Sequence, residues 1–163
     1  IIGMFGACDK GDDDVQTFYQ APSGTADITL TTTGGTEFKL NGPCGWAYAA
    51  GVGYVGANQL NDSSKAFSID TNLTELPTET TTFTITNDIL DENPLKVSVH
   101  FIDYEGSGYT SFDGYIGSGT VTFVVEGSKV TVNLAGVTLA PDSVNDAPYN
   151  QNGELTGTLT FYR

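Results

Sequence analysis

Apolar and polar residues alternate with a period of two along most of the chain. In the segment "TADITLTT", Ile28 and Leu30 lie on one side of an extended chain and the threonines lie on the other. Phe38 and Leu40 repeat the pattern after a pair of glycines. A period of two is typical of strands with one buried face, and a glycine pair between two such segments favours a turn. We therefore predict a β-hairpin over residues 25–41.

The same alternation recurs to the end of the chain, interrupted by short segments rich in glycine, proline or asparagine. Residues 120–139 give the clearest second hairpin, with its turn at Glu126-Gly127, and residues 95–105 are expected to be the longest strand. Trp46 is expected in the core. The other apolar positions expected to face inward are Phe67, Ile69, Phe83, Ile85, Val97, Val99, Phe101, Val121, Phe123, Val125, Val130, Val132, Leu134, Leu155, Leu159 and Phe161.

Three segments lack the alternation and are expected to connect strands. Residues 87–94 have room for one helical turn, which Pro94 would end. Residues 106–119 and 140–153 are rich in glycine or polar residues and are expected to be loops. Together these patterns predict an all-β domain, an antiparallel β-sandwich or small barrel of about nine or ten strands with at most one short helical turn.

The charge balance is strongly acidic and narrows the classes of partner. Lys and Arg together number 6 against 20 Asp and Glu, which gives a formal net charge of -14. Such a chain repels a phosphate backbone, so nucleic acid is not expected as a partner. The chain has no basic amphipathic stretch and no apolar run of the ~18 residues that a spanning helix needs. We therefore expect membrane attachment only through a covalent lipid.

The first seven residues, "IIGMFGA", are apolar and small and resemble the end of the apolar core of a signal peptide. They lead to Cys8, which follows Gly6 and Ala7. This order resembles a bacterial lipobox, in which the cysteine sulfur receives a diacylglycerol group and cleavage makes that cysteine the new N-terminus. Phe5 stands where a leucine is usual in the motif. The resemblance implies that residues 1–7 are a remnant of a signal peptide and that Cys8 is the site of lipidation.

An acidic run follows the cysteine and contains Asp9, Lys10, Asp12, Asp13 and Asp14. Lipoproteins that Bacteroidota export to the cell surface are similar, since they carry a short acidic stretch directly after the acylated cysteine. Closely spaced aspartates repel one another and stay hydrated, so residues 8–23 are expected to form an extended tether before a single β domain at 24–163. The resemblance implies an outer-membrane location with the domain facing the extracellular side.

Two alternatives concern the N-terminal residues. If residues 1–7 are retained and ordered, this apolar arm would pair with a sheet edge of a neighbouring copy, the donor-strand mode by which some surface filaments assemble. Gly3 and Gly6 interrupt the strand pattern of the arm. The second alternative is a disulfide between Cys8 and Cys44, which would exclude lipidation. If Cys8 is acylated instead, Cys44 is expected to be a free and buried thiol.

No residue pattern points to a reaction. His100 is the single histidine, and within a strand it is expected at a surface or an interface, because no Gly-x-Ser-x-Gly or cysteine-centred catalytic motif accompanies it. The carboxylates at 88–92 and 103–105 are expected to be solvated surface groups. Two cysteines without CxxC spacing and one histidine do not assemble a typical zinc site. We therefore expect no enzymatic activity, no cofactor and no metal.

Candidate contact residues gather in one aromatic segment, which holds Tyr104, Tyr109, Phe112 and Tyr115. Tyrosine combines a rigid apolar ring with a hydroxyl group, and both protein partners and sugar rings use that combination. Ser143 lies in the tripeptide 142–144, which resembles the short O-glycosylation sequon of secreted Bacteroidota proteins. Ser143 would carry the glycan.

These features predict a non-enzymatic, lipid-anchored protein of the cell surface. It would act as an accessory or interaction subunit of an outer-membrane complex or as a ligand-binding module, with a protein partner in the outer membrane or a second copy of itself. The alternatives are a filament subunit that assembles by donor-strand pairing of its N-terminal arm and a carbohydrate-binding module.

Overall fold

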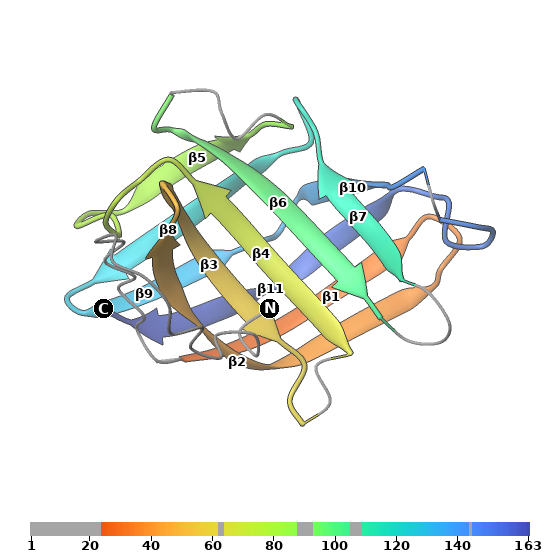
Figure 1. Cartoon of the computed structure of the whole chain (residues 1–163), viewed down its shortest axis with the longest axis horizontal. Coiled ribbons are helices and arrows are strands. Elements are labelled where there is room, and N and C mark those ends of the chain that lie inside the picture. Colours follow the sequence, from red (N-terminus) through yellow and green to blue (C-terminus); the bar gives the residue numbers. More distant parts are fainter. Residues whose placement is uncertain (1–23, 62–63, 88–92, 105–108, 144) are drawn as a thin grey trace, which may run out of the picture.

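A computed structural model describes residues 24–61, 64–87, 93–104, 109–143 and 145–163, and within these ranges it is built from β-strands without a helix (Figure 1). The eleven strands are β1 (Gly24–Thr32), β2 (Glu37–Ala49), β3 (Val52–Asn58), β4 (Lys65–Thr71), β5 (Thr81–Ile85), β6 (Lys96–Asp103), β7 (Thr110–Gly114), β8 (Thr120–Glu126), β9 (Lys129–Asn133), β10 (Val137–Pro141) and β11 (Gly153–Tyr162). The predicted all-β class is confirmed. No helix in the described ranges is long and apolar enough to cross a membrane.

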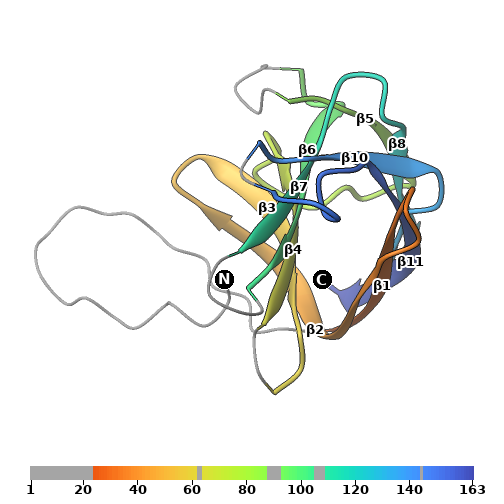
Figure 2. The ribbon, with the colours of Figure 1, turned by 90° about the vertical axis from the view of Figure 1, so that its right-hand side faces the viewer.

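The strands form one closed sheet, which makes the domain a barrel rather than a sandwich. The order is β1-β2-β3-β4-β6-β5-β8-β9-β11, and antiparallel pairing between β1 and β11 closes the ring. Figure 2 shows the strands arranged around a central axis. Closure gives the first and last of these strands a hydrogen-bonded neighbour on each edge, because β1 also pairs with β2 and β11 also pairs with β9 and β10.

One wall of the barrel divides, because two strands change partner along their length: β6 pairs with β5 and then with β7, and β11 pairs with β10 and then with β9. β8 pairs with β9, whereas β7, which precedes β8 in the chain, pairs with β10, which follows β9. The short strand β5 fills the space between β6 and β8, and it runs parallel to β6 at Thr84↔Lys96 and Ile85↔Val97. This parallel pair is the exception to the antiparallel arrangement that the sequence predicted.

The interior of the barrel is filled by apolar side chains from alternate strand positions. Phe38 packs edge-on against Phe112 with ring centroids 5.4 Å apart, and Phe83 packs in the same way against Phe123 at 5.1 Å. A fully buried side chain of this kind contributes ~1.5–3 kcal/mol, so the filled interior is the main source of stability. The predicted inward positions are confirmed apart from Val125, which is only partly buried near the end of β8.

Both predicted hairpins are confirmed. β1 pairs with β2, and β8 pairs with β9 up to Glu126↔Lys129. Gly127 has a φ of 65° in the two-residue turn between β8 and β9, a left-handed conformation that a glycine adopts without steric cost. The predicted loop at 140–153 is a loop from 142 to 152, because β10 extends to Pro141.

The longest strand is β2, with 13 residues, and not the predicted segment 95–105, where β6 has 8. The glycines in "NGPCGW" look like the end of a strand in the sequence. Gly42 instead continues the strand, because a Cβ there would lie 1.9 Å from the carbonyl oxygen of Asn58. Only glycine permits this close approach of two backbones.

The prediction of a loop over 106–119 is wrong at its centre, where residues 110–114 form β7. Phe112 is the single large apolar residue of this strand and points into the core, so the alternation was too short to detect. Gly114 is buried against Ile85 and Val99 and leaves no room for a side chain. With β7 included, the described residues form eleven strands, more than the nine or ten expected. The helical turn predicted at 87–94 falls mainly on residues 88–92, outside the described residues.

Candidate functional site

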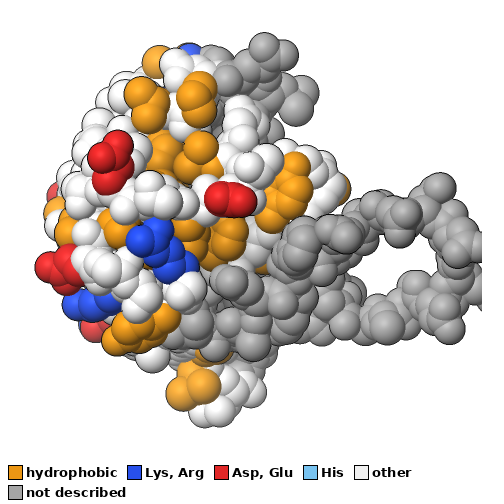
Figure 3. All heavy atoms as spheres, turned by 90° about the vertical axis from the view of Figure 1, so that its left-hand side faces the viewer, with side chains coloured by type: hydrophobic (Ala, Val, Ile, Leu, Met, Phe, Trp, Pro, Cys, Tyr) orange, Lys and Arg blue, Asp and Glu red, His pale blue; other side chains and the backbone are white. Residues whose placement is uncertain are grey.

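An apolar cleft lies at one end of the barrel, between the loop 72–80 and strand β5, and its volume is about 390 Å³. We call this loop, which joins β4 to β5, the cleft loop. The residues that line the cleft are Leu73, Thr74, Glu75, Leu76, Pro77, Thr78, Glu79, Thr81, Phe83, Pro94 and Leu95. Figure 3 views this end of the molecule, where hydrophobic side chains lie between separate acidic and basic ones. The volume is within the ~300–1,000 Å³ typical of ligand sites.

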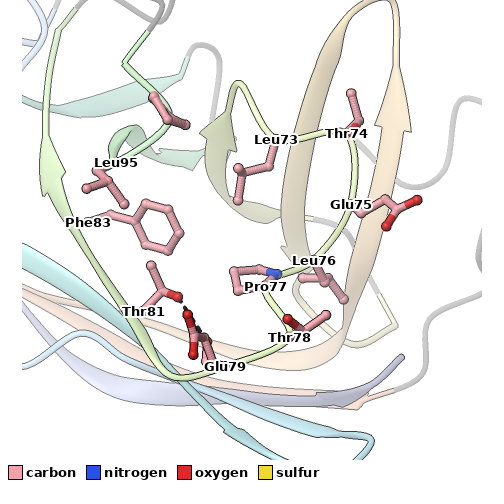
Figure 4. A pocket seen from close by; sticks show the side chains of 11 residues that line it. Leu73, Thr74, Glu75, Leu76, Pro77, Thr78, Glu79, Thr81, Phe83 and Leu95 are labelled. Atoms are coloured by element: carbon pink, nitrogen blue, oxygen red, sulfur yellow. Dashed lines mark hydrogen bonds between the residues drawn. The ribbon is translucent and has the colours of Figure 1, made fainter.

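The floor of the cleft is continuous with the core. Phe83 and Leu76 are buried, and Leu73 packs against the core. Leu95 remains 52% exposed at the margin. Leu73 and Phe83 point toward each other across the cleft, while the carboxylate of Glu75 points away from both (Figure 4). The cleft therefore has an apolar interior with polar groups at its margin, the general plan of a binding site.

Hydrogen bonds hold the cleft loop at both ends. The backbone N–H of Leu73 donates to Oγ1 of Thr71 at 2.9 Å, where the loop leaves β4. At the other end, the backbone N–H of Val125 donates to Oγ1 of Thr80 at 3.2 Å, and Oγ1 of Thr81 donates to the carbonyl oxygen of Glu79 at 2.9 Å. These contacts fix the loop in the conformation that shapes the cleft.

Arg163 holds the middle of the cleft loop. Its Nη1 donates to the carbonyl oxygen of Pro77 at 3.2 Å, and its Nη2 and Nε donate to the carbonyl oxygen of Gly127 at 2.8 and 3.2 Å. One guanidinium group thus links the cleft loop to the turn between β8 and β9. The cleft is formed in advance of any ligand, which reduces the entropy lost on binding.

A second groove, of about 500 Å³, lies on the outer face of β1, β2 and β11. The residues that line it are Gly24, Thr25, Ala26, Asp27, Asn41, Gly42, Pro43, Leu60, Thr158 and Thr160. Its lining is also mainly apolar, but its one large apolar side chain, Leu60, is exposed and the rest of the lining comes from small and polar residues. This groove lacks the buried apolar floor that the cleft has.

His100 lies on the outer face of β6 between two carboxylates. Its Nδ1 is 2.6 Å from Oδ1 of Asp113 on β7, and its Nε2 is 3.5 Å from Oδ2 of Asp70 on β4. The hydrogen bond with Asp113 raises the pKa of His100 above its ordinary value and outweighs the opposing effect of burial. Burial raises the pKa of Asp70, against the charge of His100 and a hydrogen bond from Ser68.

Both ring nitrogens of His100 therefore face carboxylates. This arrangement stabilises the imidazolium ion and does not leave a nitrogen free to accept a proton from a nucleophile. In the described part of the chain, no group of three or more His, Cys, Asp or Glu side chains is placed to hold a metal ion.

Cys44 is a free and buried thiol. Its Sγ donates a weak hydrogen bond to the carbonyl oxygen of Thr160 at 3.7 Å. Burial raises the pKa of Cys44 to about 12, so the thiol stays protonated and acts as a small apolar group. Cys8 itself lies outside the described residues, as do Asp9, Lys10, Asp12, Asp13 and Asp14.

The predicted aromatic contact residues divide into two groups. Tyr104 and Tyr109 are 41% and 52% exposed at the facing ends of β6 and β7, and Tyr115 is partly buried. Phe112 is fully buried among the core phenylalanines, so its prediction as a surface contact is wrong. Ser143 is exposed, and its hydroxyl donates to Oδ1 of Asp142 at 3.1 Å.

The cleft was not predicted from the sequence. Its apolar residues come from a segment, "NLTELPTETTTF", in which Leu73 and Leu76 do not alternate with a period of two. The sequence gives one indication of the cleft, which is the presence of two leucines and Pro77 in a connecting loop. Apolar residues in a short loop need a surface to pack against. The hydrogen bond between Arg163 and Pro77 joins residues far apart in the chain, so no local sequence pattern indicates it.

Comparison with protein families, with characterised proteins and with solved structures gives no match to this chain.

Proposed function

We propose that this protein is a non-enzymatic, lipid-anchored binding module of the cell surface, and that it contacts its partner through the cleft. The observation that carries the proposal is the preformed apolar cleft of about 390 Å³ at the end of a barrel whose interior is otherwise filled. Eight-stranded and slightly larger barrels either fill with side chains or hold one small ligand inside. Here the interior is filled, so binding is expected at the end of the barrel.

The anchor is supported by the order of residues at the N-terminus, where small residues, Cys8 and the acidic run follow an apolar segment. The sixteen residues of the tether at 8–23 would span about 20 Å as a flexible coil and at most about 55 Å if fully extended. β1 begins at Gly24, next to Phe161 of β11 and at the same barrel end as the cleft (Figure 1). The cleft would thus face partners that lie near the membrane.

The arrangement around His100 favours a role without catalysis. Asp113 and Asp70 occupy its two nitrogens, and the group joins three neighbouring strands across the outer face of the barrel. An ion-pair cluster of this kind stabilises the sheet.

Of the alternatives, donor-strand assembly is disfavoured by the pairing of β1 and β11, because both strands have neighbours on each edge. One observation supports carbohydrate binding as an alternative function. Tyr104 and Tyr109 are exposed at the facing ends of two neighbouring strands, at the opposite end of the barrel from the cleft.

Intact mass spectrometry of the protein purified from its native host tests the anchor. We expect a mature chain that begins at Cys8 and carries acyl chains, and we expect a Cys8→Ser variant to lose both the acyl mass and membrane attachment. An unmodified chain that retains residues 1–7, or a disulfide between Cys8 and Cys44, would rule the anchor out.

Nuclear magnetic resonance of the ¹⁵N-labelled full chain tests the cleft. The neutral peptide acetyl-Leu-Leu-Gln-amide is expected to shift amide signals of the cleft loop and of β5, and Leu95→Asp is expected to abolish these shifts. Ile116→Asp is the matched control, because Ile116 is an exposed apolar residue outside the cleft. Shifts that are absent, or that survive in Leu95→Asp, would refute the cleft as a binding site.

A further inference from the structure

We infer that the occupant of the cleft is an extended segment of a partner polypeptide in which an apolar side chain stands next to a lysine or arginine. This inference rests on the proposed function, because it names the partner chemistry of the same site. It follows from the shape of the cleft, the charges at its margin and its position on the barrel.

The shape favours an extended segment. The two walls of the cleft are the cleft loop, which bends several times, on one side and the extended strand β5 with Leu95 on the other (Figure 4). The second wall is fixed as well, because the backbone N–H of Thr84 donates to the carbonyl oxygen of Leu95 at 3.0 Å. The cleft is open to solvent. An open cleft between rigid walls receives the side chain of a passing polypeptide without enclosing it.

The charge at the margin favours a cation. Glu75 and Glu79 are exposed on either side of Pro77, and the lining residues include no lysine or arginine. Arg163 contacts the cleft loop, but its guanidinium is already bonded to the carbonyl oxygens of Pro77 and Gly127. The negative potential of these two carboxylates would favour a basic residue beside the inserted apolar side chain, and the net charge of -14 would speed its approach.

The position of the cleft favours a polypeptide held in the same membrane. Because β1 begins at the cleft end of the barrel, a lipid on Cys8 would keep this end within the reach of the tether from the bilayer surface. Two components attached to one membrane have a high effective concentration, so a shallow cleft is sufficient for their association.

Three matched peptides test the inference: acetyl-Leu-Leu-Lys-amide, acetyl-Leu-Leu-Gln-amide and acetyl-Leu-Leu-Glu-amide, each titrated into the full ¹⁵N-labelled chain at low salt. We expect the lysine peptide to bind about threefold more tightly than the glutamine peptide. The glutamate peptide should bind more weakly than the glutamine peptide by a similar factor, because exposed charge pairs change affinity by about this much. The preference is expected to shrink in high salt.

The double variant Glu75→Gln with Glu79→Gln is expected to bind the three peptides equally. The control variant Asp146→Asn with Glu154→Gln removes the same charge from exposed positions outside the cleft, and it should keep the preference. Equal binding of all three peptides to the unaltered chain would overturn the inference but leave the cleft as a site. Failure of every peptide to shift the cleft signals would overturn the proposed function as well. A preference that the control variant also loses would show a general charge effect and overturn the inference.

Discussion

The guanidinium group of Arg163 donates a hydrogen bond to the carbonyl oxygen of Pro77 across 3.2 Å, between residues 86 positions apart in the chain. The same group holds the turn at Gly127, so the end of β11, the cleft loop and the β8–β9 hairpin are joined at one point. These hydrogen bonds connect the cleft loop to two other segments at the same end of the barrel.

Arg163→Ala should therefore loosen the cleft loop. We expect a loss of about 1 kcal/mol in the free energy of unfolding, as for one exposed charge-assisted hydrogen-bond group. Amide exchange should rise in the cleft loop, and acetyl-Leu-Leu-Gln-amide should bind more weakly. Arg163→Lys keeps the charge but not the planar set of donors, so it should behave like Arg163→Ala in exchange measurements. Exchange that is unchanged in both variants would contradict this role.

The His100 cluster predicts that stability falls as the pH rises above neutrality. The folded-state pKa of His100 is raised above the 6.5 of the unfolded chain. Its stabilising contribution is therefore complete below about pH 6.5 and is lost as the pH rises through the folded-state value. The raised pKa of Asp70 also makes stability fall as the pH rises, but in a lower pH range, because the folded state favours the protonated form of this carboxyl group.

Urea unfolding at about pH 6 and about pH 9 measures this effect. Because the His100 side chain is 37% exposed, solvent screening should keep the difference below about 1 kcal/mol. His100→Gln keeps hydrogen-bonding capacity without the titration, so its stability should vary less over this range. A His100→Gln variant with the same pH dependence as the unaltered protein would show that other groups cause it.

Gly114 tests the account of β7. A Cβ at this position would lie 2.6 Å from Cγ2 of Ile85 and 3.5 Å from Cβ of Val99, both inside the barrel. Gly114→Ala should therefore lower the free energy of unfolding by about 1–3 kcal/mol through overpacking. Gly34→Ala is the control, because its Cβ would meet only the flexible side chain of Gln151. Equal stability of the two variants would contradict the buried position of Gly114.

Cys44 should resist thiol reagents in the folded protein. Burial raises its pKa to about 12, so almost no thiolate is present at neutral pH. Alkylation by iodoacetamide, followed by peptide mass spectrometry, should modify Cys44 only after denaturant unfolds the barrel. Rapid alkylation of Cys44 in the absence of denaturant would show that the thiol is accessible.

The fold was largely predictable from the sequence, because a strand with one face in the core must alternate. Phe38 and Leu40 in β2 and Val121 and Phe123 in β8 show this directly, and all four are buried. β7 was missed because Phe112 is its one large apolar residue and the next inward position, 114, is a glycine. Closure of the sheet into a barrel depends on pairing between β1 and β11, whose register no local pattern encodes.

The candidate site was less predictable than the fold. The cleft needs Leu73, Phe83 and Leu95 on one surface, and the path of the chain between β4 and β6 decides whether they meet. The parallel pairing of β5 with β6, which places Leu95 beside Thr84, is a tertiary feature of this kind. The buried position of Phe112 likewise follows from ring contacts with a distant strand.

Site-specific photo-crosslinking in cells of the native host tests the central claim most directly, with a photoreactive amino acid placed at position 95 in the cleft or at position 116 outside it. We predict that position 95, and not position 116, forms an adduct with a membrane-held polypeptide at an apolar residue next to a lysine or arginine, and that Cys8→Ser removes the adduct. Adducts that form equally at both positions, or that persist without Cys8, would contradict a lipid-anchored binding module that acts through this cleft.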